Sequence, residues 1–235
     1  MNENKWDELK KLGLDFQEQH IRRTYRQMQG EVFDALMDKL VQFVRLIPPC
    51  CTPLEKATLL YYVVSRCITY DYPSANEKCK DERQGYTYAG AVLNGTAVCN
   101  GISQVYARLC QASGVRCDIV EGYANDPAEK GLHAWVQVWL PDKQGQLHAY
   151  HCDPTWDLVE FCPDGDFVYF LKSDAYMNEH KHYWDKDWGK AQGKQKYAVC
   201  PRNGPKPPKI PEDGIEIMCQ FFKKMKQPER FVLRA

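Results

Sequence analysis

The sequence predicts an α+β fold in which helices come first and an antiparallel β-sheet follows. Apolar residues recur at helical spacing through the first half of the chain. The second half holds short segments rich in β-branched and aromatic residues, separated by turn residues, which is typical of strands. The 235 residues, 44% of them hydrophobic, suffice for one sizeable core. Helices followed by strands favour the α+β class.

The N-terminal part is predicted to be helical. One apolar stripe marks a helix within residues 1–47, and Pro48 and Pro49 end it because proline cannot continue a helix. A second helix is predicted over 53–67, with Pro53 in its first turn. The stripe consists of Phe33, Leu36, Met37, Leu40, Val41 and Val44.

A third helix is predicted to begin at Cys99, with an apolar face that includes Ile102, Tyr106 and Leu109, and to end at Ser113 and Gly114. The segments "VRCDIVEGY", "LHAWVQVWL" and "QLHAYHCD" are predicted strands, and "DFVYFLKS" is a candidate for one more. A proline-rich linker follows from residue 200, and "IEIMCQFFKKMKQ" is predicted as a short amphipathic helix.

Charge and cysteine content limit the classes of function. Lys+Arg and Asp+Glu balance at 31 each, so we expect neither nucleic acid nor a membrane as a partner. The first 20 residues are charged and lack the apolar core of a secretory signal. We therefore expect a cytoplasmic protein whose eleven cysteines are reduced. Zinc is not expected, because no C-x-x-C spacing occurs.

Two of the predicted strands form a hairpin that pairs a histidine with an aspartate. A five-residue loop from Pro141 to Gly145 places Trp139 opposite Leu147 and His133 opposite Asp153. Opposed residues have Cβ atoms roughly 4.5–5.5 Å apart, which lets a carboxylate hold an imidazole. A loop of four or six residues would instead turn Asp153 to the other face.

Cys99 has the location of an activated thiol. A helix N-terminus offers unpaired N–H groups and the positive end of the helix dipole, both of which favour a thiolate. Together with His133 and Asp153 it forms the Cys/His/Asp set of nucleophilic catalysis. Because the chain has eleven cysteines and six histidines, a chance grouping of this kind is also easy to draw.

Three sequence words in this order resemble the core of the transglutaminase-like superfamily: "GTAVCNG", "HAWVQV" and "HCDPTWD". The resemblance also covers "YDY" before the cysteine. The segment "YFLKSDAYMNEHKHYWDKDW" after the aspartate is similar to one in small bacterial members. The similarity spans about residues 60–190.

The resemblance implies a papain-like core in which a cysteine-bearing helix packs on an antiparallel sheet. It implies Cys99 as nucleophile, His133 as base and acid, and Asp153 as the orienting carboxylate. The implied reaction is acyl transfer through a thioester on a protein or peptide substrate: proteolysis, deamidation or cross-linking. No cofactor is expected, and no metal either, because the chain has no D-x-[DN]-x-[DN]-G calcium loop. The expected division is a helical extension at 1–50, a catalytic core at 51–195, and a linker and tail at 196–235.

Further residues are assigned to the same cleft. Tyr86 or Tyr88 is a candidate second oxyanion donor, although core packing is the simpler role for each. Trp135 and His151 share the face of His133 and are candidates for lining the cleft, whereas His180 and His182 are interpreted as solvent-exposed. A binding or scaffolding module that keeps the fold without its chemistry is the alternative function. The oligomeric state stays open.

Overall fold

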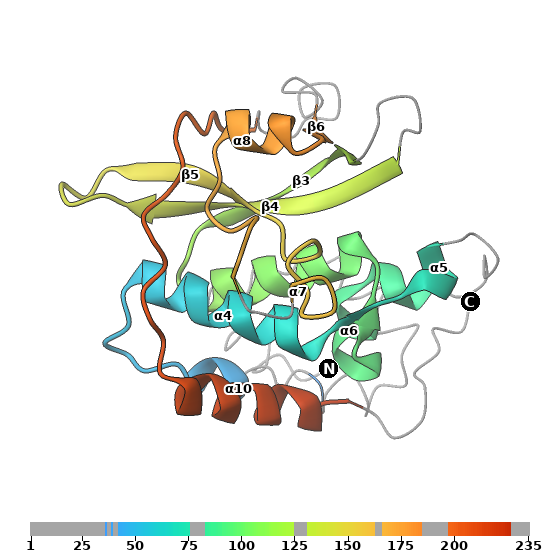
Figure 1. The fold of residues 1–235 in the computed structure, drawn as a ribbon. Coiled ribbons are helices and arrows are strands. Elements are labelled where there is room, and N and C mark those ends of the chain that lie inside the picture. Colours follow the sequence, from blue (N-terminus) through green and yellow to red (C-terminus); the bar gives the residue numbers. More distant parts are fainter. Residues whose placement is uncertain are drawn as a thin grey trace, which may run out of the picture.

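The computed structural model describes Leu36, Lys39 and residues 42–75, 83–124, 131–162, 166–184 and 197–226. Its elements stack in layers (Figure 1). The main sheet lies over a group of helices. A C-terminal helix covers the side of that group that faces away from the sheet, and a short helix lies on the outer face of the sheet.

Two of the predicted helices occur where the sequence places them. Helix α4 spans Pro53–Cys67 and begins with a capping box, in which Thr52 and Glu55 each accept a hydrogen bond from the other's backbone N–H. Helix α7 spans Cys99–Ala112, with Ser113 as its C-cap and Gly114 at φ 84°. Shorter helices are α5 (Tyr72–Ala75), α6 (Tyr88–Asn94) and α8 (Asp174–Glu179), and a 3₁₀ turn covers Arg83–Tyr86.

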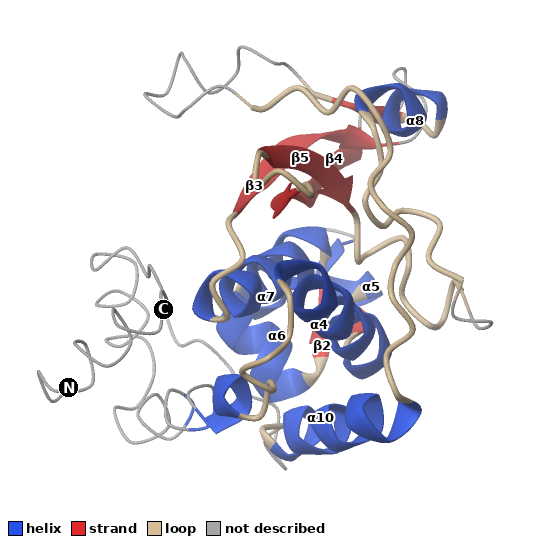
Figure 2. Ribbon diagram, turned by 90° about the vertical axis from the view of Figure 1, so that its left-hand side faces the viewer, coloured by secondary structure: helices blue, strands red, loops and turns tan. Residues whose placement is uncertain are grey.

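The main sheet is antiparallel throughout, which confirms the predicted α+β class. Its strands are β3 (Cys117–Ala124), β4 (Gly131–Pro141), β5 (Leu147–Cys152) and β6 (His182–Tyr183), in the order β5-β4-β3-β6. A separate parallel pair, β1 (Thr69–Tyr70) and β2 (Thr96–Ala97), leads into α7. Figure 2 shows β3, β4 and β5 together, between α8 and the group that includes α4, α6 and α7.

Two predicted elements of secondary structure are not found as predicted among the described residues. The segment 166–173 is not a strand, because it touches the sheet through a single bridge between Lys172 and His151. Within the predicted helix of residues 1–47, the structure describes helix only at Leu36, Lys39 and 42–45. The remainder lies outside the described residues.

One hydrophobic core joins the helices to the inner face of the sheet. Tyr61 of α4, Tyr106 of α7, and Val136 and Val138 of β4 are all fully or almost fully buried in it. Helix α10 (Glu212–Lys224) belongs to the same core, since Phe222 packs edge-on against Phe43 at a ring distance of 5.7 Å. Among the helices of the described residues, none is both long and apolar enough to cross a bilayer.

Candidate active site

Cys99 is the first residue of α7, and a hydrogen bond between the residue before it and the 3₁₀ turn fixes its position. Val98 is the N-cap residue, and its backbone N–H donates to the carbonyl oxygen of Gly85 at 3.0 Å. The N–H groups of a first helical turn have no acceptor within their own helix. The Cys99 sulfur therefore lies beside donors and the positive end of the helix dipole, and its side chain is partly exposed.

His133 and Asp153 meet on one face of the sheet. Nε2 of His133 lies 2.7 Å from Oδ2 of Asp153, and both side chains are buried. The predicted contact is thus present, but the predicted strand pairing is wrong by two residues. The loop is 142–146, β4 pairs Gln137 with His151, and β5 ends before Asp153. A shift of two keeps each side chain on its face, because side chains alternate along a strand.

The surroundings favour the charged form of both groups. Burial acts to lower the pKa of His133, but the carboxylate of Asp153, by charge and hydrogen bond, and the hydrogen-bonding Cys99 together raise it to about 10. Burial acts to raise the pKa of Asp153, but His133 and a second imidazole hold it well below its usual range. Since Nε2 of His133 is taken by Asp153, Nδ1 is the nitrogen left for the sulfur.

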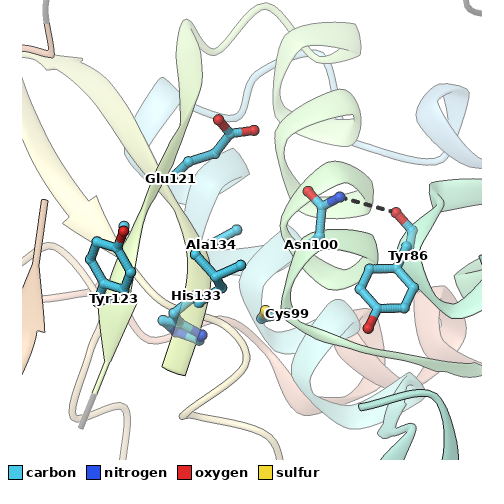
Figure 3. A pocket seen from close by; sticks show the side chains of 9 residues that line it. Tyr86, Cys99, Asn100, Glu121, Tyr123, His133 and Ala134 are labelled. Carbon is cyan, nitrogen blue, oxygen red and sulfur yellow. Dashed lines mark hydrogen bonds between the residues drawn. The ribbon is translucent and has the colours of Figure 1, made fainter. Parts of the chain in front are cut away.

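Cys99 and His133 share the wall of a cavity of about 420 Å³. Figure 3 shows His133 on one side of this cavity and Cys99 across from it, with Tyr86 beyond the sulfur. Leu132 and Tyr123, both exposed, add apolar surface where β3 and β4 pair. The full lining is Tyr86, Cys99, Asn100, Glu121, Gly122, Tyr123, Leu132, His133 and Ala134.

Part of the chain matches a known protein family. Residues 43–150 match the sequence model of the transglutaminase-like superfamily, a stretch that includes α7 and β4, which carry Cys99 and His133, and that ends before Asp153. The chain contains a transglutaminase-like domain. It is 27% identical over 205 residues to kyphoscoliosis peptidase of Homo sapiens, which covers 78% of this chain and 28% of that protein. The chain therefore spans less than a third of that relative's length.

Two further similarities are more limited. Kyphoscoliosis peptidase of Mus musculus is 27% identical over 148 residues, covering 57% of this chain and 20% of that protein. A solved structure described as the crystal structure of a TGase aligns over 93% of this chain and 58% of its own, with 16% identity and a TM-score of 0.43.

Of the four other residues predicted to line the cleft of the transglutaminase-like domain, only Tyr86 lies at the cavity. Tyr86 lines it, and its phenol donates to the carbonyl oxygen of Ser74 at 3.1 Å. Tyr88 is buried beneath the guanidinium of Arg108, 4.7 Å from its ring. It does not reach the cavity, because the first turn of α6 directs it into the core.

The other two residues lie behind His133 and do not line the cleft as predicted. The indole of Trp135 stacks on the ring of His133 at 5.8 Å and donates through Nε1 to Nδ1 of His151 at 2.8 Å. Both side chains are fully buried. A second apolar cluster with Met177 of α8 and Tyr197 covers this face of the sheet, so the polar side of β4 does not face solvent.

His182 is the site residue that sequence reasoning missed. It was interpreted as solvent-exposed, but it is fully buried, with Nε2 2.8 Å from Oδ2 of Asp153. Strand β6 brings it there by pairing His182 with Ala124 at the far edge of β3. No local pattern in the polar segment around it could have indicated this long-range pairing.

Two sets of potential metal ligands occur among the described residues. His133, Asp153 and His182 form one, and His151, Asp174 and Cys200 form the other, with ligand atoms within 4.8 Å of one another in each. In the first set both imidazoles contact Oδ2 of Asp153, and in the second Nε2 of His151 lies 3.0 Å from Oδ1 of Asp174 while Sγ of Cys200 accepts from Nε2 of Gln137 at 3.3 Å. These contacts account for both groupings, and we assign neither as a metal centre.

Proposed function

We propose that this domain carries out thiol-dependent acyl transfer or hydrolysis at a peptide or glutamine-type carboxamide carbonyl. Cys99 is the nucleophile, His133 the general base and acid, and Asp153 the residue that orients His133. One observation carries the proposal: the imidazole held by Asp153 at 2.7 Å faces, across an open cavity, a cysteine at a helix N-terminus.

Each step of the proposed reaction has a group in place. The Cys99 thiolate attacks the carbonyl carbon, and the backbone N–H of Cys99 donates to the developing oxyanion. Collapse of the tetrahedral intermediate breaks the C–N bond, and the leaving amine takes a proton from His133. Water or a second amine then attacks the thioester while His133 accepts its proton. The thiol is released as the acid or the new amide forms.

A protein or peptide is the proposed substrate. The exposed Leu132 and Tyr123 at the cavity favour an apolar side chain next to the reacting carbonyl. The two curated relatives are named as peptidases, which favours water as the acceptor. A reducing compartment such as the cytoplasm is part of this proposal, since all ten described cysteines carry free thiols.

Alkylation kinetics test the proposal. At neutral pH, iodoacetamide is expected to label Cys99 faster than Cys162, a partly exposed thiol that serves as an internal reference. His133→Ala is expected to slow the labelling of Cys99 and leave Cys162 unchanged. Equal rates at the two cysteines in the wild-type protein would argue against activation.

A substrate-level experiment completes the test. Incubation with a peptide library and an amine probe, followed by mass analysis, is expected to yield hydrolysed or amine-modified peptides that Cys99→Ala no longer produces. If Cys99→Ala keeps the protein's cellular role, the domain acts as a binding module instead.

A further inference from the structure

Asp153 is held by two imidazoles at the same oxygen. Its Oδ2 lies 2.7 Å from Nε2 of His133 and 2.8 Å from Nε2 of His182. Its Oδ1 accepts from the backbone N–H groups of Thr155 at 2.9 Å and Trp156 at 3.4 Å. With four donors around it and no exposed surface, this carboxyl group is an acceptor on every side.

The partners of His182 determine which of its ring nitrogens carry protons. Nδ1 lies 2.9 Å from the carbonyl oxygen of His180, and a carbonyl only accepts, so Nδ1 carries a hydrogen. Nε2 faces Oδ2 of Asp153, whose pKa is held low by its neighbours, so Nε2 also carries a hydrogen. An imidazole with two N–H groups is a cation.

A second cation balances the negative charges of the proposed reaction. The Cys99 thiolate and the Asp153 carboxylate supply two negative charges, and the imidazolium of His133 supplies one positive charge. An uncompensated charge is costly away from water. The titratable groups that face His182 are His133, Asp153 and Tyr169, at ring distances of 5.4 Å for His133 and 5.3 Å for Tyr169.

Aromatic rings enclose His182 on its remaining sides. Its ring lies 4.4 Å from that of Trp156 and 5.2 Å from that of Trp135. These rings separate it from solvent and are suitable neighbours for a cation.

We propose that His182 is a positioning residue that donates a hydrogen bond to Asp153 as a second imidazolium. Its positive charge cancels the second of the two negative charges, so that Cys99, His133, Asp153 and His182 together carry no net charge. This inference rests on the proposed function. His182 is thus a fourth group beside Cys99, His133 and Asp153, and its charge favours the thiolate of Cys99. Removing that charge disfavours the thiolate.

The first test compares pH profiles of Cys99 alkylation. His182→Gln keeps an amide donor for Asp153 and removes the positive charge. We expect the midpoint of the Cys99 profile to move to higher pH by about one unit or more. His148→Gln is the matched control, because His148 pairs with Asp142 at 2.8 Å in the distant hairpin loop, and it should leave the profile unchanged. A folded His182→Gln protein with the wild-type midpoint would overturn the proposal.

The second test needs neither a variant nor an activated thiol. The ring nitrogen chemical shifts of His182 in the wild-type protein, measured by NMR at neutral pH, should be those of the doubly protonated form, and a neutral tautomer would overturn the proposal. If Cys99 is not activated but His182 is doubly protonated, the proposed function fails while the charge assignment of His182 stands. The two proposals can therefore fail separately.

Discussion

Gly101, in the first turn of α7, lies directly against the carbonyl oxygen of Gly85. A Cβ atom at Gly101 would stand 2.4 Å from that oxygen and 2.9 Å from Cβ of Ala97. The same carbonyl accepts the backbone N–H of Val98 at 3.0 Å. The missing side chain thus lets the 3₁₀ turn hold the segment that leads into Cys99.

Gly101→Ala is expected to destabilise the fold by about 1–3 kcal/mol, because the added methyl group meets backbone that cannot move without shifting α7. Gly214→Ala is the control, since Gly214 lies in α10 with nothing within 4 Å of an added Cβ. That change should stabilise the protein by about 0.5–1 kcal/mol. Urea unfolding measures both, and similar effects at the two glycines would contradict the close approach.

Phe222→Ala tests whether the C-terminal helix is part of the core. Phe222 is 1% exposed and contacts Phe43, so its truncation should lower the free energy of unfolding by about 3–5 kcal/mol. Ile217 on the same helix is 57% exposed, and Ile217→Ala should change stability by less than about 0.5 kcal/mol. Thermal unfolding of the two variants would show a single shared transition if α10 and the core unfold together.

Asp157→Asn tests how much a second buried carboxylate contributes to the stability of the fold. Asp157 accepts from the Tyr61 phenol at 2.7 Å and from the backbone N–H groups of Val168 at 2.9 Å and Tyr169 at 2.8 Å. Burial raises the pKa of Asp157 to about 6. An amide would turn an NH₂ group toward one of these donors, at a cost of about 1–3 kcal/mol. Asp118→Asn, at an exposed position of β3, is the control. Chemical denaturation compares the free energies of unfolding of the two variants.

The His133–Asp153 pair is expected to make stability depend on pH. The pKa of His133 rises from 6.5 to about 10 on folding, so its contribution is complete below 6.5 and is lost as pH rises through about 10. The pKa of Asp153 falls below its usual 3.8, so its contribution holds above 3.8 and is lost at lower pH. The destabilisation caused by His133→Ala should therefore be largest between pH 3.8 and pH 6.5, where both contributions are complete. Urea unfolding across pH 3 to 10 measures it, and a constant difference would refute the linkage.

The sequence by itself determined the elements whose signals are local. The start of α4 at Pro53, the stop at Ser113 and Gly114 after α7 and the alternation of side chains along β4 depend only on neighbouring residues. Local alternation also put His133 and Asp153 on one face. Alternation could not determine the exact strand pairing, because the turn begins one residue later than the composition of the loop suggests.

Only the tertiary structure decided how the site is enclosed. Trp135 and His151 share a face with His133, but α8 and Tyr197 cover that face, so they support the imidazole from behind and do not line the cavity. His182 reaches Asp153 because two residues of β6 pair with the edge of β3 across a long stretch of chain. Periodicity reports only which side of its own element a residue takes. What lies on that side is set by packing between segments far apart in the sequence.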